Sequence, residues 1–595
     1  MTSDNILVLL ILGAAVALFI WDKLRVDVVA LMVLVSLVLS GLVDAGDAFA
    51  GFANPAVVSV WGVFIVSGAV AQAGVGDLIA QQMMRWAGGS PRKLLIGIML
   101  ASGLISSFMN NVGAVALLLP AVIAVGRQMR ISPSKLLMPL AYSALLGGNM
   151  TLIGTPPNIL ASGLLKTAGF TSFSMFSFTP TGLLVLGAGV LYMVFIGQRL
   201  LPDHPPTGEL ADDYALNHYI IEVRVAEQSP LVDKHLWETN FGQQFDLQIV
   251  QVRHWQGLEA PTTERPIQAG DVLTILGPLD KIISVSQSHI LQPVREWKSG
   301  DWHPSLETEG LKLVEVTLNR QSRFQGYTLK KLDFREKYSL SVLAMRHSGQ
   351  EIVEHLGEVP VVVGDVLLVQ GTEDKIELLR RNPNFVILDD APIKMDEKKL
   401  RKAPLAVGIL LLVIGVVTAE WLDIATMMVI GSLLMVLTRV INMDEAYRLI
   451  DWQAVFLIAA MLPLGTAMED TGTAALLANH IVQWVGGWGP LAVLAGLSLF
   501  TALLTEVISN AAATVLMVPI AIGASIGMGV DPHGMVMATV IAASTSFLTP
   551  VGHQANVIIY GPGGYKFSDY ARVGAGLNLV VWLIIVLFVP LFWPF

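Results

Sequence analysis

The 595-residue chain carries too few charges for a soluble protein of its length. Apolar residues make up 54% of it and charged residues 14%, against roughly a quarter in an average globular protein. Of the 84 charged residues (37 basic plus 47 acidic), 54 lie between residues 203 and 402 (31 acidic plus 23 basic), which leaves 30 for the other 395 residues. This distribution excludes a single soluble enzyme and predicts a membrane protein with a water-exposed module in its middle. The module holds −8 of the net charge of −10, which does not suggest a nucleic-acid binder.

Apolar runs long enough to cross a bilayer occur in two sets of six. They lie near residues 4–20, 26–44, 54–74, 93–126, 134–165 and 179–200, and near 403–419, 424–441, 452–469, 488–528, 533–560 and 573–593. The fourth run of each set is interrupted near its middle, by Asn110-Asn111 and by Ser509-Asn510. We interpret both as re-entrant hairpins, with two full spans as the alternative, since irregular backbone at membrane depth must be buried or line a wet cavity. The expected fold is a polytopic α-helical membrane protein with ten spans and two hairpins, in two halves over residues 1–202 and 403–595.

Each half then crosses the membrane five times, so the second half has the opposite orientation to the first. With the N-terminus outside, thirteen of the fourteen basic residues of the two halves face inward, and only Lys166 faces outward. This asymmetry predicts that both termini lie on the outer side of the cell inner membrane and that the central module is cytoplasmic.

The two halves also resemble each other in sequence. At an offset of 399 or 398 residues, the matching pairs are Asn111 and Asn510, Leu117 and Leu516, Pro120 and Pro519, Thr151 and Thr549, Gly154 and Gly552, and Asn158 and Asn556. An inverted repeat with Gly- and Pro-interrupted segments at corresponding positions is typical of a secondary transporter.

The module repeats itself at a spacing of 93 to 94 residues, most clearly in Gly270-Asp271-Val272-Leu273 and Gly364-Asp365-Val366-Leu367. Short β-branched runs predict strands over 219–225, 247–253, 272–276, 313–318, 340–346 and 366–369. Each set is closed by a predicted helix after an Asp-Lys pair. We therefore expect two small α+β domains, over 203–300 and 301–402.

The tips of the interrupted runs and the breaks that follow them, 147–157 and 544–552, have a composition suited to ion binding. Helix ends in mid-membrane expose amides that attract an anion and carbonyls that, with Asn and Ser oxygens, suit a hard cation such as sodium. Ser106 and Thr505, one turn before their tips, could each add a hydroxyl. The alternative is that the small residues only permit close helix packing.

The paired tips and the run Gly154-Thr155-Pro156-Pro157-Asn158 resemble the divalent anion/sodium symporter family of the ion-transporter superfamily. The resemblance implies an elevator mechanism in a homodimer, with sodium as the coupling ion and the only metal. It implies sodium sites formed by Ser106, Asn110, Asn111 and Gly154, and by Thr505, Ser509, Asn510 and Thr549. Anion contacts would come from Asn111, Thr155, Pro156, Asn510 and Pro550.

The sequence departs from the family pattern at both tips, which read Asn-Asn-Val and Ser-Asn-Ala and lack the family's threonine. Because two hydroxyls are missing, a compact tetrahedral anion such as sulfate is favoured over a C4 dicarboxylate, which stays the alternative substrate.

Glu506 and His553 are the two remaining unusual residues. An intramembrane carboxylate is costly, so Glu506 is either a cation ligand or proton carrier, or a protonated acid bonded to a backbone carbonyl. As a proton carrier it would fit a different class, a cation/proton antiporter of the same superfamily. His553 either lines the cavity or caps a helix.

The module resembles the C-terminal domain of regulators of potassium conductance, on its Gly-Asp-Val-Leu turns and on Arg253 and Arg346. That resemblance implies pairing between subunits and a small ligand, often a nucleotide, at the pair interface, with a ligand-free dimerisation module as the alternative. A channel gated by the module is a third class. The chain shows no phosphate-cradling glycine loop, so ATP-driven transport is not expected. As a secondary transporter, the protein is not expected to be an enzyme.

Overall fold

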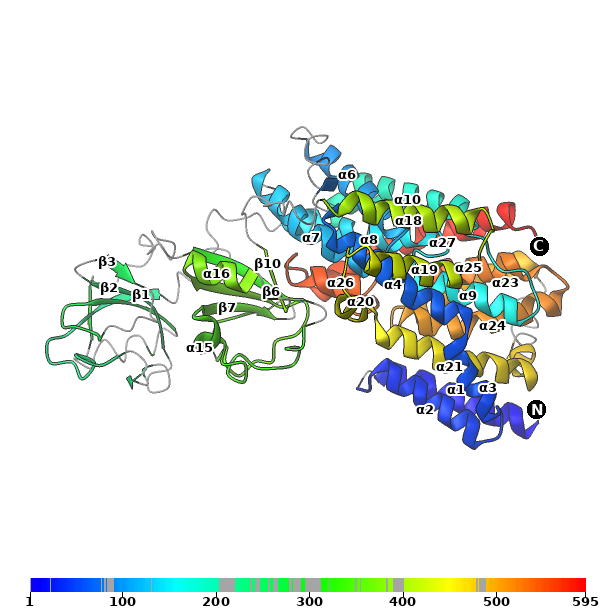
Figure 1. The fold of residues 1–595 in the computed structure, drawn as a ribbon, viewed down its shortest axis with the longest axis horizontal. Coiled ribbons are helices and arrows are strands. Elements are labelled where there is room, and N and C mark those ends of the chain that lie inside the picture. Colours follow the sequence, from blue (N-terminus) through cyan, green and yellow to red (C-terminus); the bar gives the residue numbers. More distant parts are fainter. Residues whose placement is uncertain are drawn as a thin grey trace.

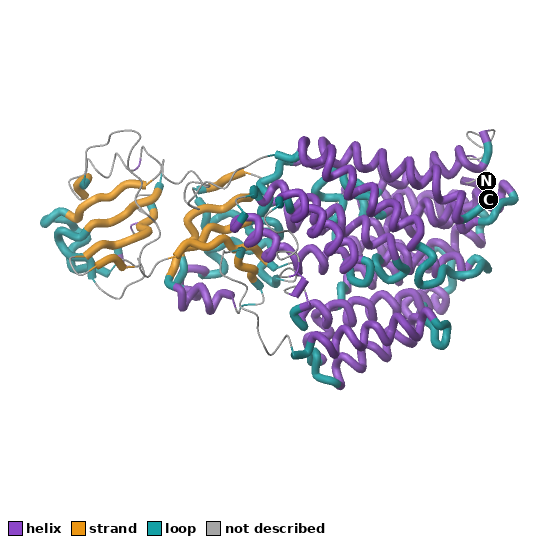
Figure 2. Tube along the Cα trace, turned by 90° about the horizontal axis from the view of Figure 1, so that it is seen from above, coloured by secondary structure: helices purple, strands orange, loops and turns teal. Residues whose placement is uncertain are grey.

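A computed structural model describes the whole chain apart from residues 1, 22, 76–77, 80–81, 83–89, 130, 203–219, 236–237, 240, 242–246, 255–256, 260–265, 278–280, 282–290, 295–311, 320–321, 348–349, 354, 381, 383, 389–400, 478–479 and 481–487. It consists of a helical body and two β-sheets (Figure 1). The sheets lie in line with the body, and both chain termini lie at the end of the body away from the sheets (Figure 2).

Within the described residues, the first half of the body contains nine helices, followed by a short extension of the last one. They are α1 (Ser3–Trp21), α2 (Val26–Leu39), α3 (Ala45–Ala50), α4 (Pro55–Gln72), α6 (Pro91–Ser106), α7 (Asn111–Gln128), α8 (Leu137–Gly147), α9 (Pro156–Thr167) and α10 (Thr179–Tyr192). Short turns η1 (Gly51–Ala53), η2 (Pro133–Lys135) and η3 (Gly148–Met150) join some of them, and α10 continues through η4 (Met193–Gly197) into α11 (Gln198–Leu200).

The second half repeats this order of elements. Its helices are α18 (Ala403–Thr418), α19 (Ile424–Leu437), α20 (Met443–Leu449), α21 (Trp452–Asp470), α23 (Pro490–Leu504), α24 (Asn510–Met528), α25 (Pro532–Ala543), α26 (Gln554–Tyr560) and α27 (Phe567–Phe592). Within the described residues, six helical segments are long and apolar enough to cross a membrane, and several shorter apolar helices accompany them. The chain is therefore a predominantly helical, multi-pass membrane protein. The predicted number of crossings and the re-entrant course of α6–α7 and α23–α24 stay predictions.

The two halves are intertwined rather than placed side by side. Helix α2 packs on α21 and α19 packs on α4, so each half supplies a partner to the other (Figure 1). The helices that follow the breaks behave alike, because α9 packs on α24 and α26 packs on α7. Both interrupted regions are thereby brought into one buried core, which extends over nearly every helix of the body.

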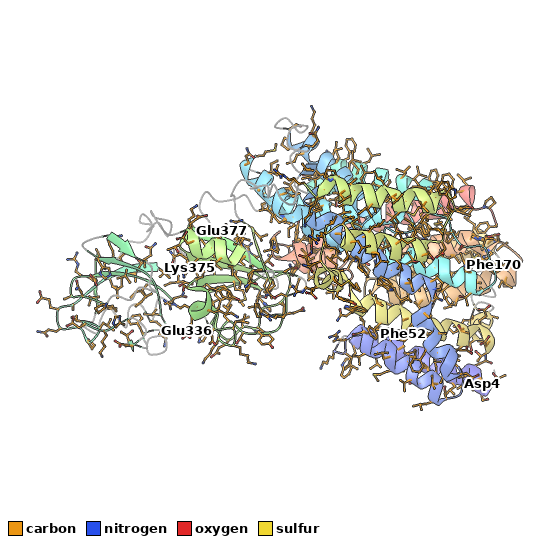
Figure 3. The ribbon with its side chains drawn as sticks, viewed as in Figure 1. Asp4, Phe52, Phe170, Glu336, Lys375 and Glu377 are labelled. Carbon is orange, nitrogen blue, oxygen red and sulfur yellow. The ribbon has the colours of Figure 1, made fainter. Side chains whose placement is uncertain are left out.

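Both sheets have five antiparallel strands and the same topology. The first contains β1 (Ile220–Val225), β2 (Gln248–His254), β3 (Gly257–Glu259), β4 (Val272–Leu276) and β5 (Leu291–Pro293) in the order β3-β2-β4-β1-β5. The second contains β6 (Lys312–Leu318), β7 (Ser341–His347), β8 (Gln350–Ile352), β9 (Val366–Gly371) and β10 (Phe385–Ile387) in the order β10-β6-β9-β7-β8. Both carry an irregularity at the matching point, between Ile249 and Gln251 and between Val342 and Ala344. The second sheet is accompanied by α15 (Phe334–Tyr338) and α16 (Glu373–Arg380), on which Figure 3 shows Lys375 and Glu377.

Strands occur at all six positions expected from the sequence. Helix α16 begins one residue before the Asp374-Lys375 pair, whereas the helix expected after Asp280-Lys281 lies outside the described residues. The domain limits proposed at residues 203 and 300–301 also fall outside the described residues, and the division into domains stays a prediction.

The two sheets pack against each other through apolar faces. Val250 and Leu276 of the first sheet form one buried cluster with Leu343, Leu368 and other residues of the second. The side-chain amide nitrogen, Nε2, of Gln248 donates across the junction to the Val342 carbonyl at 3.3 Å. The two sheets of one chain therefore pack on each other, and the pairing between subunits expected of such domains stays a prediction.

Candidate functional site

The first tip places a serine hydroxyl on a buried asparagine. Helix α6 ends at Ser106 and α7 begins at Asn111. The Ser106 hydroxyl donates to Oδ1 of Asn111 at 2.8 Å, and both side chains are buried. Asn110 instead accepts a hydrogen bond from the Val112 amide at 3.1 Å and so caps the start of α7. The tip thus divides its polar side chains between the helix cap and the interior.

The first break is held to the tip and to α9 by side-chain hydrogen bonds. Asn158, in the first turn of α9, donates through Nδ2 to the Gly148 carbonyl at 3.1 Å and to the Thr151 carbonyl at 2.8 Å. The Thr151 hydroxyl donates to the carbonyl of Ser107 in the tip. A Cβ atom on Gly154 would collide with the carbonyl of Gly148, so only glycine fits at this close approach. Tip, break and α9 are therefore one connected unit.

The second tip and break are built in the same way. The hydroxyls of Thr505 and Ser546 donate to Oδ1 of Asn510 at 2.8 and 2.7 Å. Asn556 donates through Nδ2 to the Ser546 carbonyl at 2.8 Å and to the Thr549 carbonyl at 3.1 Å. All of these side chains except that of the half-buried Thr549 are buried.

The hydrogen bonds of the two sites correspond pairwise at the offsets found in the sequence. Thr549 donates to the Glu506 carbonyl at 3.1 Å, as Thr151 does to Ser107. Ser509 accepts a hydrogen bond from the Ala512 amide at 3.3 Å and caps α24, as Asn110 caps α7. The two sites therefore share one hydrogen-bond geometry, including the positions of individual donors and acceptors.

Each site leaves buried amide atoms without a hydrogen-bond partner among the described residues. These are Nδ2 of Asn111 and Asn510 and Oδ1 of Asn158 and Asn556, on side chains that are at most 6% exposed. An unpaired buried polar group costs about 1–3 kcal/mol. The orientations of Asn158 and Asn556 follow from their double donation to carbonyls. Each half therefore presents a free amide donor, suited to an anion, and a free oxygen, suited to a cation.

Glu506 lies in the second tip, and its side-chain carboxylate accepts four hydrogen bonds, all from N–H groups. Its Oε1 accepts from the amides of Phe547 at 2.8 Å and Leu548 at 2.9 Å, and from Nδ2 of Asn578 at 3.2 Å. Its Oε2 accepts from the Thr549 amide at 3.0 Å. None of these contacts is to a carbonyl oxygen, in contrast to the expectation of a protonated acid bonded to the backbone.

The remaining predicted residues have plainer surroundings. Thr155 precedes α9 as its N-cap without a side-chain cap bond, Pro156 opens that helix, and Pro550 is buried in the second break. His553 precedes α26, and its Nδ1 accepts a hydrogen bond from the Ala555 amide at 3.0 Å. His553 therefore caps this helix, which is one of the two interpretations that the sequence offers.

Sequence reasoning missed several residues that complete the site. Asn158 and Asn556 stood out only as matched positions of the repeat, although they hold both breaks. Ser546 replaces Gly148 at the matched position and adds a hydroxyl to the second site. Asn578 comes from α27, far along the chain, and nothing in the sequence connects it to Glu506.

A cavity of about 370 Å³ lies between α21 on one side and α9 and α24 on the other. Its walls are mostly apolar and include Pro463, Gly465 and Pro519, while Asp47 and Glu469 are its acidic members. None of the predicted site residues lines it. The cavity separates the helices that carry the site from α21 over part of their contact.

Intertwined apolar helices with two buried polar centres at helix breaks define a membrane transporter. The sequence profile of the citrate transporter family, CitMHS, matches residues 16–542, and the chain belongs to this family. It is 34% identical over 584 residues to the uncharacterized transporter sll0640 of Synechocystis, covering 97% of this chain and 95% of that one. It is 28% identical to sodium/sulfate cotransporter 1 of Chlamydomonas reinhardtii over 63% of this chain and 43% of that one. It is also 28% identical to the sodium-dependent dicarboxylate transporter SdcS of Staphylococcus saprophyticus, over 29% of this chain and 34% of that one.

Proposed function

We propose that the protein is a sodium-coupled secondary transporter of a small anion, with sulfate as its substrate. The observation that carries the proposal is the pair of matched centres, each with a buried, unpaired Asn amide donor beside a group of oxygens. Relatives named as sodium/sulfate cotransporters support sodium coupling and the substrate class.

The chemistry of the centres favours sodium together with a compact anion. Hydroxyl, amide and carbonyl oxygens are the ligands preferred by hard cations. The tips and breaks contain no Lys or Arg in the sequence, so the anion is held by the amides of Asn111 and Asn510 and by the co-bound cations. The proposed sodium ligands are Ser106, Asn110, Asn111 and Gly154, and Thr505, Ser509, Asn510 and Thr549, with Thr155, Pro156 and Pro550 beside the anion.

Transport proceeds, in this proposal, by an elevator motion of the helices that carry the tips and breaks. The cavity between α21 and the pair α9 and α24 supports it, because it leaves that contact incompletely packed. We propose further that the protein is a homodimer in the cell inner membrane, with both termini outside and the sheets in the cytoplasm.

We propose that the two sheets form a regulatory module with domains over 203–300 and 301–402. A cavity of about 310 Å³ at the junction of the sheets is lined by Gln248 from the first and by Lys330 and Arg335 from the second. Asp333 and Glu336 line it as well, so the lining has no net charge, and the proposal of a nucleotide ligand rests on the resemblance to regulators of potassium conductance. Thermal-shift measurements on the full chain with a panel of nucleotides test this ligand class, and no shift with any of them would leave the module a scaffold.

Uptake of labelled sulfate into proteoliposomes tests the transport proposal. We expect uptake with an inward sodium gradient, no uptake when potassium replaces sodium, and little competition by excess succinate. Uptake of succinate without uptake of sulfate would establish the C4-dicarboxylate alternative, which the similarity to SdcS supports. Absence of both, with sodium-dependent proton release, would establish an antiporter that uses Glu506.

A further inference from the structure

The carboxylate of Glu506 is bound mainly by backbone N–H groups, which can act only as hydrogen-bond donors. Three of its four hydrogen bonds come from the backbone amides of Phe547, Leu548 and Thr549, at 2.8, 2.9 and 3.0 Å. A side-chain amide can be turned round, but a backbone N–H only donates. Three fixed donors on two oxygens are the environment of an ionised carboxylate, as in charge-assisted bonds at helix N-termini.

Among the described residues, no Lys or Arg side chain pairs with this carboxylate. The side chain of Glu506 is 6% exposed, and its four hydrogen bonds within the described part of the chain all come from neutral N–H groups. The twelve described basic residues of the two membrane halves lie in the connections and near helix ends. A buried carboxylate without a partner is costly, so its natural partner is a cation that binds from solution.

Gly552 packs closely beside the carboxylate. A Cβ atom built on it would lie 3.1 Å from Oε2 of Glu506, from Oγ1 of Thr549 and from Cβ of Ser546. Thr549 also donates to the main-chain carbonyl of Glu506 and accepts from the Gly552 amide. Nearby, Oδ1 of Asn556 is buried and unpaired within the described residues, and Asn556 is bonded to the Thr549 carbonyl. Carboxylate, hydroxyl and amide oxygens of Glu506, Thr549 and Asn556 therefore belong to one hydrogen-bonded stretch of the second break.

The first half lacks this charge at the matching position. The counterpart of Glu506 is Ser107, whose hydroxyl donates to the Leu104 carbonyl at 2.6 Å within its own helix end. Gly182 contacts Asn149 as Gly574 contacts Phe547, which aligns Leu186 with Asn578. Where the second half has a carboxylate and an amide, the first has a serine and a leucine.

We propose that Glu506 is a fixed carboxylate that balances the charge of the cation bound in the second half. The two matched centres therefore bind sodium unequally, and the second binds it more tightly. This inference rests on the proposed sodium-coupled transport. It makes Glu506 a residue that determines cation affinity and positions the break, and not a carrier that gains and loses a proton in each cycle.

Four variants test the inference in the full-length protein. Glu506→Gln removes the charge and keeps the shape, and Glu506→Asp keeps the charge. Asn578→Leu loosens the carboxylate without changing its charge and introduces the residue of the first half. Ser107→Ala is the matched change in the first half.

Two measurements are made on each variant. One is the sodium concentration for half-maximal sulfate uptake, and the other is thermal stabilisation of the detergent-solubilised protein by sodium alone, which does not require transport. Because unit charges a few ångströms apart interact strongly in a buried site, we expect Glu506→Gln to raise the required sodium concentration by about tenfold or more in both assays. Glu506→Asp should recover part of the loss, Asn578→Leu should have a smaller effect than Glu506→Gln, and Ser107→Ala should match the wild type.

Equal sodium dependence of Glu506→Gln and the wild type in both assays would overturn the inference. Proton movement that accompanies transport in the wild type and disappears in Glu506→Gln would also overturn it, in favour of a proton carrier. If the wild type shows sodium-dependent stabilisation but no anion uptake, the proposed function fails while the inference on the cation site is still tested by stabilisation.

Discussion

Replacement of Gly364 by alanine tests whether the sheets act on the second break. Gly364 lies in the turn before β9, and a Cβ atom there would lie 2.6 Å from the carbonyl oxygen of Val557 in α26. Its own carbonyl contacts Gly561, just after α26, and Val366 belongs to the apolar core of the helical body. The second sheet therefore rests directly on the helix that follows the second break.

The first sheet provides a matched control at Gly270, in the equivalent turn. Both glycines have positive φ, +99° for Gly364 and +88° for Gly270, but a Cβ atom on Gly270 would meet nothing within 4 Å. Alanine at a positive φ costs roughly 1–2 kcal/mol at either position. Only Gly364→Ala adds a steric clash, for which overpacking costs of about 1–3 kcal/mol are typical. The difference between the variants thus isolates the contact with α26.

Sodium-driven uptake measures the consequence. Helix α26 carries Asn556, which holds the carbonyls of Ser546 and Thr549, so displacement of α26 should loosen the second cation site. We expect Gly364→Ala to raise the sodium concentration for half-maximal uptake at least about fivefold, the lower end of typical coupling energies. Gly270→Ala should lower thermal stability and leave sodium dependence unchanged. Equal sodium dependence in the two variants would refute a coupling of the sheets to the site through this turn.

Three further substitutions test single residues of the site. Asn510→Ala removes the oxygen that joins tip and break and the free amide donor, so sodium-dependent transport should be abolished; an unchanged sodium dependence would contradict the assignment. Asn556→Leu removes two buried hydrogen bonds and should lower stability by about 2 kcal/mol, seen as a lower melting temperature, with a similar loss expected for Asn158→Leu in the first half. His553→Ala removes a helix cap worth about 1 kcal/mol and should leave the uptake rate within about twofold of the wild type, whereas loss of transport would place His553 in the ion path.

The sequence predicts the helices, the interruptions and the strands because each depends on local composition and periodicity. The tips at residues 107–110 and 505–509 lie where Asn and Ser interrupt long apolar runs. The repeat identifies Asn158 and Asn556 as equivalent, but not what they do. Their role depends on carbonyls that point inward only because the chain leaves the helix at the breaks.

Contacts between distant segments could not be predicted in this way. Asn578 meets Glu506 because α27 crosses α23 and α25 in the folded body, and no local pattern records that crossing. The pairing of the sheets within one chain is of the same kind, since alternating apolar residues indicate a buried face without saying what covers it.

The inverted arrangement that we propose would explain why, within the described residues, the second sheet touches α26. In the proposed topology the helices after the breaks, α9 and α26, run to opposite sides of the membrane. Only α26 then ends on the side where the sheets lie, and the contacts of Gly364 with Val557 and Gly561 occur there. The helix within their reach belongs to the half that contains Glu506, the centre for which we propose the tighter sodium binding. A module that acts through α26 would therefore act on the site with the higher proposed sodium affinity. This geometry favours an effect on sodium affinity over an effect on anion affinity.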